Sequence, residues 1–137
     1  MTAEKPDISN FERIIARLEE AIAEYEKDTT KTIVRDGHIQ RFEFNYEIAH
    51  KKLKRFLEFA SPSPKQYDKM IFQDLIRSGN EQSLLLGDWT DWKQYRDIRY
   101  KTSHAYDEEI ALEVLAGIPA FLKEARHLRN KLKERLA

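Results

Sequence analysis

The 137-residue chain contains no cysteine, four glycines and four prolines. Without cysteine it can form neither disulfides nor thiolate metal sites. So few turn residues argue against a fold of many short strands. No apolar run approaches the roughly 18 residues that a membrane-spanning helix needs. The N-terminal stretch MTAEKPDISNFE also lacks the basic and then apolar pattern of a secretory signal. We therefore expect a cytoplasmic protein with no membrane segment.

Apolar residues make up 41% of the chain and charged residues 35%. That composition is too apolar for a disordered chain and suits helices with charged outer faces. The formal net charge is zero, so bulk charge does not point to nucleic acid. Residues 93–101 are an exception, because four basic residues and one acidic residue give them a net charge of +3. The length suggests one domain, residues 1–137, with a single core.

Apolar residues recur at spacings of three and four, which is typical of amphipathic helices. A first helix is expected to begin at Ser9, which has capping-box spacing with Glu12, and to end near residues 27–30. The longest helix is expected from residue 33 or 36 to residue 59. Its heptad-like seam comprises Ile39, Phe42, Tyr46, Ala49, Leu53 and Phe56.

Capping residues and helix-breaking residues predict three further helices. Ser63 and Pro64 have the cap and first-turn chemistry of a third helix, which Gly79 should end. The apolar stretch SLLLG after it should pack over the end of the bundle. A fourth helix is expected from about residue 88 to residues 102–103, and a fifth from residues 107–109. The sequence thus predicts an all-α, up-and-down bundle of four or five antiparallel helices.

The stretch RYKTSHAYDEE, residues 99–109, places an arginine, a histidine and a tyrosine within eight positions. On one continuous helix Arg99 and His104 would lie roughly 140° apart and would not share a face. If the helix ends at residues 102–103, the long arginine side chain can reach back toward the imidazole. His104 and Tyr106 are two residues apart, so in an extended linker they point to the same side. We therefore expect these three groups to converge.

Such a set could cleave RNA without a metal ion. A histidine with a pKa near ~6.5 can accept the proton of the attacking 2′-hydroxyl. The guanidinium of Arg99 can bind two oxygens of the charged phosphorane in a fork. The leaving 5′-oxygen needs a second proton, which a two-fold dimer with two such sites side by side would supply.

Composition alone leaves a simpler interpretation open. Arg99 can pair with an acid, His104 can fill a helix-end position and Tyr106 can belong to the core, as in a helical interaction protein with no site. His38 and His50 are expected on the helix surface. No His, Asp or Glu cluster has convincing metal spacing, and there is no Gly-rich phosphate loop.

Residues 36–54 read DGHIQRFEFNYEIAHKKLK. Together with RYKTSHAY, Trp92 and the Ser63-Pro64 pair, this block resembles the nucleotidyltransferase substrate-binding protein family of the HEPN superfamily. The resemblance covers about residues 9–134. It implies an up-and-down helical bundle that forms a homodimer and is commonly encoded beside a minimal nucleotidyltransferase. We expect no cofactor.

Some members of this family resemble HepT toxins, which are ribonucleases that carry Arg-x4-His-x-Tyr. The resemblance implies that Arg99 and His104 are the ribonuclease pair. It also implies that Tyr106 receives AMP from the partner nucleotidyltransferase, the antitoxin, which silences the toxin. A non-catalytic subunit that presents a nucleotide or substrate to the transferase is the alternative.

Three further residues bear on this hypothesis. Tyr100 stands where the family usually has a polar residue, so it could alter the orientation of the active pair or accept a modification itself. Glu43 and Glu47 are four residues apart and share a helical face. They could orient a basic group of the site or be neighbouring charges on a solvated face.

Overall fold

The computed structural model describes residues 4–137 and contains helices but no strands within that range. Its elements are α1 (Ser9–Lys27), α2 (Thr32–Ala60), the 3₁₀ helix η1 (Pro64–Tyr67), α3 (Phe72–Glu81), α4 (Trp89–Lys101), the 3₁₀ helix η2 (Thr102–His104) and α5 (Glu108–Leu136). The prediction of an all-α bundle is confirmed. No helix in the described range combines the length and the apolar character that a membrane crossing requires.

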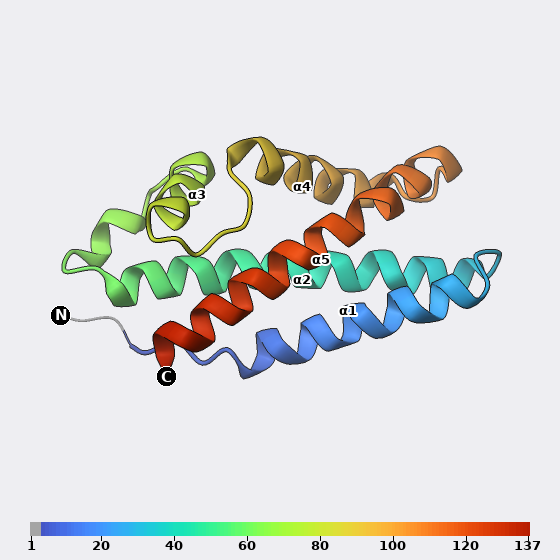
Figure 1. Ribbon diagram of the computed structural model, residues 1–137. Helices are drawn as coiled ribbons and strands as arrows, with labels where there is room; N and C mark the ends of the chain where they lie inside the picture. Colours follow the sequence, from blue (N-terminus) through green and yellow to red (C-terminus); the bar gives the residue numbers. More distant parts are fainter. Residues whose placement is uncertain (1–3) are drawn as a thin grey trace.

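Three long helices form the body of the bundle. In Figure 1, α1 and α2 run antiparallel, and α5 lies across both of them. The shorter α4 packs against α5 and α2, and α3 packs against α2 and α4. The chain therefore crosses the molecule back and forth, and residues 99–106 lie at the end where α1 turns into α2.

Aromatic side chains in the core hold α4 in place. Trp92 of α4 is fully buried, and its ring centroid lies 6.2 Å from that of Phe121 in α5 and 6.4 Å from that of Tyr46 in α2. Phe42 of α2 meets Phe121 edge-on at 5.3 Å. Edge-on contacts of this kind are favourable beyond the area they bury. Because Arg99 is on the same helix as Trp92, this cluster also fixes the position of Arg99.

The predicted capping box at the start of α1 is wrong. Ser9 is the first helical residue, and its backbone N–H donates to the Asp7 carboxylate at 2.9 Å. Ile8 occupies the cap position and offers no side-chain hydrogen bond. The hydrogen-bond acceptor at the start of α1 is therefore Asp7, whereas the prediction assigned this role to Ser9.

The predicted third helix is split into two parts. Pro64 is the first residue of η1 as expected, but Ser63 makes no capping hydrogen bond and α3 begins only at Phe72. The ring of Tyr67 is buried, and its hydroxyl forms a hydrogen bond with Ser78 Oγ at 2.9 Å. This contact folds η1 back onto α3 in place of a continuous helix.

Gly79 lies inside α3, which continues to Glu81, so the prediction that Gly79 ends the helix is wrong. A Cβ atom at residue 79 would lie 2.8 Å from Leu85 Cδ1 and 3.2 Å from Leu53 Cδ1. Glycine is therefore needed here for close packing rather than for helix termination. The SLLLG stretch packs onto the bundle as expected, because residues 84 and 85 are buried.

Glu124 of α5 is fully buried, which the sequence patterns do not reveal. Its two carboxylate oxygens accept hydrogen bonds from the backbone N–H groups of Leu86 at 2.7 Å and Gly87 at 2.8 Å. Burial raises the pKa of the Glu124 carboxyl, and the two amide hydrogen bonds oppose that rise. These bonds fasten the loop that leads into α4.

The prediction that His38 and His50 lie on the helix surface is wrong for His38 and holds only in part for His50. His38 is 4% exposed and its ring centroid lies 5.6 Å from that of Tyr25. Burial lowers the pKa of His38 to about 4. His50 is half-buried, with its ring 4.6 Å from Phe72, and burial followed by the charge of Lys54 lowers its pKa as well. Both histidines flank the apolar seam of α2.

Candidate functional site

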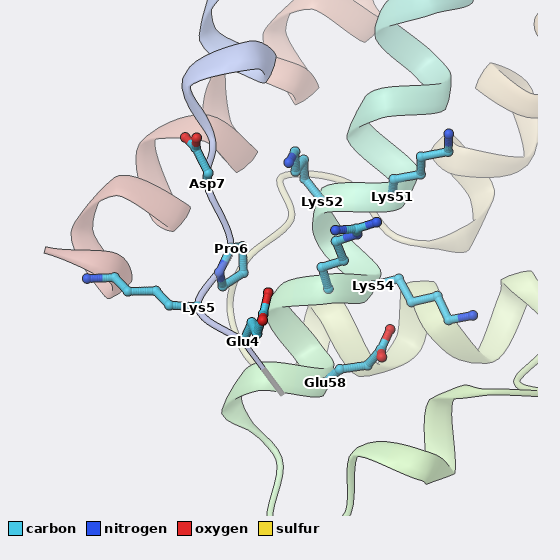
Figure 2. Close-up of a pocket in the computed structure, with 9 residues that line it drawn as sticks. Glu4, Lys5, Pro6, Asp7, Lys51, Lys52, Lys54 and Glu58 are labelled. Carbon is cyan, nitrogen blue, oxygen red and sulfur yellow. The ribbon is translucent and has the colours of Figure 1, made fainter. Parts of the chain in front are cut away.

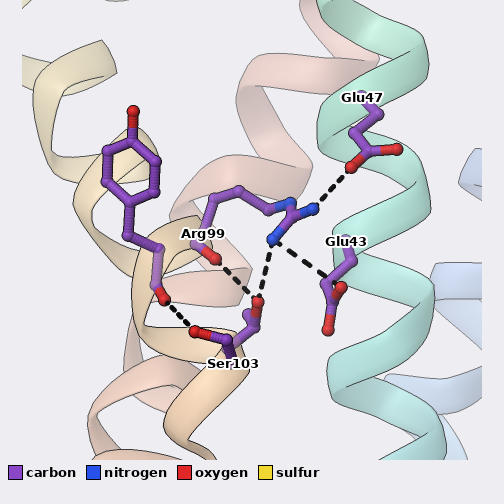
Figure 3. A network of polar contacts seen from close by, with 6 residues as sticks. Glu43, Glu47, Arg99 and Ser103 are labelled. Atoms are coloured by element: carbon purple, nitrogen blue, oxygen red, sulfur yellow. Dashed lines mark hydrogen bonds and ion pairs between the residues drawn. The ribbon is translucent and has the colours of Figure 1, made fainter.

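Arg99 lies in the last turn of α4 and faces two acids of α2 (Figure 3). Its Nη2 donates to Glu47 Oε1 at 2.5 Å, and its Nη1 lies 3.7 Å from Glu43 Oε2. The two acids are one helical turn apart, so they approach the guanidinium from the same face. They therefore pair with a basic group of the predicted site instead of standing alone on a solvated face.

Thr102 also holds Arg99 and was not anticipated as a site residue. Arg99 Nη1 donates to Thr102 Oγ1 at 3.1 Å, and this hydroxyl donates to the Arg99 backbone carbonyl at 2.6 Å. Thr102 is buried, whereas the Arg99 side chain keeps 26% of its surface exposed. The spacing Arg-x2-Thr at a helix end is the sequence signal that would have identified it.

His104 and Tyr106 follow directly after α4 at the surface. The helix ends at Lys101 and continues as η2, which confirms the predicted end near residues 102–103. His104 is exposed, Tyr106 is 86% exposed, and their rings meet edge-on with centroids 6.1 Å apart. Within residues 4–137 no hydrogen bond joins either ring to Arg99. The rings of His104 and Tyr106 thus lie beside each other. The prediction that both side chains converge directly on the Arg99 guanidinium is wrong.

The η2 turn is fixed by capping on both sides. Asp107 Oδ1 accepts the backbone N–H groups of Glu109 at 3.0 Å and Ile110 at 3.2 Å, which starts α5 as predicted. The Ser103 hydroxyl donates to the backbone carbonyl of Tyr100 at 3.0 Å. The Tyr100 side chain itself is 67% exposed, and it makes no hydrogen bond within the described part of the chain.

A groove of about 700 Å³ separates the start of α2 from the segment after α4. Tyr106 and Glu43 both line it, so it adjoins the Arg99 network. Arg35, on the same groove, donates to Glu108 at 2.9 Å, and this hydrogen bond is the main cause of the raised pKa of Arg35. The volume is in the range of pockets that hold small molecules. We call it the Tyr106 groove.

The arrangement offers three chemical functions at one end of the bundle. A fixed guanidinium can bind a phosphate, an exposed imidazole can transfer protons, and an exposed phenol can be modified. Among residues 4–137, no group of three or more His, Asp or Glu side chains is placed to hold a metal ion.

Comparison with known proteins gives consistent matches. The family model described as nucleotidyltransferase substrate binding protein like matches residues 6–134. A protein named probable ribonuclease HepT, from Haemophilus influenzae, is 38% identical over 112 residues, a match covering 79% of this chain and 76% of that protein. The solved structure of HI0074 from Haemophilus influenzae, described as the fold of a substrate binding domain of a nucleotidyltransferase, is also similar. It aligns with a TM-score of 0.86 and 30% identity, covering 93% of this chain and 99% of the other.

Proposed function

The chain belongs to the nucleotidyltransferase substrate-binding protein family, and from that premise we propose that it is the toxin of a toxin–antitoxin pair. In this proposal residues 1–137 form one HEPN-like domain that dimerises in the cytoplasm and cleaves RNA without a metal ion. A minimal nucleotidyltransferase is its antitoxin partner. The observation that carries the proposal is Arg99, fixed by Glu43, Glu47 and Thr102, with an exposed His104 five residues further on.

Cleavage would be a transesterification at phosphorus. His104 accepts the proton of the ribose 2′-hydroxyl as the O2′–P bond forms. The P–O5′ bond breaks, leaving a 2′,3′-cyclic phosphate and a 5′-hydroxyl. Arg99 binds the two non-bridging oxygens, whose charge grows in the transition state. The imidazolium of the partner subunit's His104 protonates the leaving 5′-oxygen, which is why the proposal requires a homodimer.

Glu43 and Glu47 act as positioning residues in this scheme. They hold the guanidinium over α2 while no phosphate is bound. The Glu47 side chain is 51% exposed, so it can turn into solvent when a phosphate takes its place on Nη2. The positive charge of Arg99 is thus paired with the Glu47 carboxylate before RNA binds and with the RNA phosphate afterwards.

Tyr106 would be the point of control. Its hydroxyl is accessible to a second enzyme because the side chain is 86% exposed. Attack on the α-phosphorus of ATP would form a tyrosyl phosphodiester and release pyrophosphate. The resulting anion and nucleoside would occupy the space beside His104 and repel the RNA phosphate. Tyr100, also exposed, is the second candidate acceptor.

The test is cleavage of a mixed RNA in EDTA by protein whose intact mass shows no AMP. Wild type should cleave and His104→Ala should not, although it should melt at the same temperature because His104 is exposed. His127→Ala, on α5, is the matched control and should cleave normally. A fully active His104→Ala protein would contradict the proposal.

A non-catalytic, nucleotide-binding subunit is the second candidate, and the Tyr106 groove favours it. In that case wild type and His104→Ala would both fail to cleave RNA. Both would bind a nucleoside triphosphate, and Gln40→Trp at the groove would weaken that binding.

A further inference from the structure

Four basic residues follow Glu47 along α2: Lys51, Lys52, Lys54 and Arg55. We call them the basic stripe. Several other cations of this protein pair with acids, as Arg35, Arg99 and Arg126 do. No residue of the basic stripe forms an ion pair within residues 4–137. Unpaired cations grouped on one surface favour an anionic ligand.

The basic stripe lines a groove of about 620 Å³ (Figure 2). The opposite wall is the N-terminal segment, residues 4–7. Five basic and three acidic side chains line the groove, so its net charge is +2. One of those acids, Asp7, already accepts the Ser9 amide at the start of α1. The groove therefore presents positive charge in a concave surface.

This groove is continuous with the Arg99 network. Lys51 and Lys54 also line a second hollow of about 330 Å³, which contains Glu47 and His50. Residues 43, 47, 51 and 54 are separated by four, four and three positions, so they share one face of α2. The helix rise places Lys54 about 10 Å along the axis from Glu47, which itself holds Arg99. A short stretch of single-stranded RNA can span that distance.

We infer that the basic stripe binds backbone phosphates of the RNA strand next to the phosphate held by Arg99. Lys51 and Lys54 meet the nearest phosphates, and Lys52 and Arg55 extend the contact into the groove. The half-buried ring of His50, supported by Phe72, offers a base a surface on which to stack. Continuity with a phosphate-binding arginine favours RNA over an acidic protein surface. This inference rests on the proposed ribonuclease function and adds a binding site that the reaction itself does not require.

The experiment measures binding of a labelled single-stranded RNA to the His104→Ala protein as salt is raised. Each phosphate contact to a single strand contributes about 0.7 to the slope of log K against log salt. Lys51→Gln/Lys54→Gln should therefore lower the slope by about 1.4 and weaken binding roughly tenfold at moderate salt. Circular dichroism melting verifies that the variant remains folded.

Lys65→Gln/Lys69→Gln is the matched control. These two lysines are exposed, lie between α2 and α3, and carry the same charge. Their removal should leave the slope unchanged. Equal slopes for the two double variants would overturn the inference. So would unchanged RNA binding together with weakened binding to the nucleotidyltransferase, because the stripe would then be a protein-docking surface. Binding is measured without cleavage, so an inactive wild type would contradict the proposed reaction and leave this test valid.

Discussion

Acidification should destabilise the protein through His38. Its ring is 4% exposed, and neither ring nitrogen has a hydrogen-bond partner among the described residues. Burial lowers its pKa to about 4 in the folded state, whereas the unfolded chain has the ordinary value near ~6.5. Between these values the unfolded state binds more protons, so stability is lost as the pH falls through that window. The full difference between the folded and unfolded pKa values corresponds to about 3 kcal/mol of unfolding free energy. About 2 kcal/mol of this is lost as the pH falls from about 7.5 to about 5.

The assay is urea unfolding at a series of pH values, comparing wild type with His38→Leu. Leucine removes the titrating ring and suits the apolar surroundings. The difference in unfolding free energy between the two proteins should shift by about 2 kcal/mol in favour of His38→Leu over that pH range. Taking this difference cancels the opposite contribution of Glu124, whose pKa is raised. Parallel plots of unfolding free energy against pH for wild type and His38→Leu would refute the reasoning.

Three further predictions concern the remaining polar and packing contacts. Glu124→Ala should lower the free energy of unfolding by about 2–4 kcal/mol in urea, because two loop amides lose their acceptor; an unchanged value would mean that water replaces the carboxylate. Gly79→Ala should lower the free energy of unfolding by about 1–3 kcal/mol despite the better helix propensity of alanine, because the added Cβ meets the Leu85 side chain. This loss should shrink when Leu85 is also replaced by alanine. Thr102→Val should lower the proposed RNA cleavage roughly tenfold with little change in melting temperature, and an unaffected rate would show that Arg99 needs no support from the hydroxyl.

The helices were predictable because each stripe of apolar residues reports the face that a helix buries. The seam from Ile39 to Phe56 is buried as expected, and α2 spans residues 32–60 against the predicted 33 or 36 to 59. The break before Phe72 was not predictable, because it depends on the tertiary contact between Tyr67 and Ser78. The burial of His38 was within reach of the sequence, since it lies beside the seam.

The site was predictable only where it depends on local chemistry. The helix end near Thr102 and the acids that start α5 follow from neighbouring residues, and both are confirmed. The contact between Arg99 and Glu47 joins residues 52 positions apart, so it depends on how α4 docks onto α2. No local pattern reveals such a pair, although the shared face of Glu43 and Glu47 kept the possibility open.

That 52-residue separation also sets an order of events during synthesis. Chains emerge from the ribosome N-terminus first, so α2 and its two acids exist before Arg99 has been made. The packing of α4, which carries Arg99, is complete only when Trp92 also meets Phe121, which lies in the last helix. A nascent or prematurely ended chain would therefore carry the acids and the arginine without an assembled site. Translation itself would thus keep the proposed toxin inert until almost the whole polypeptide is complete.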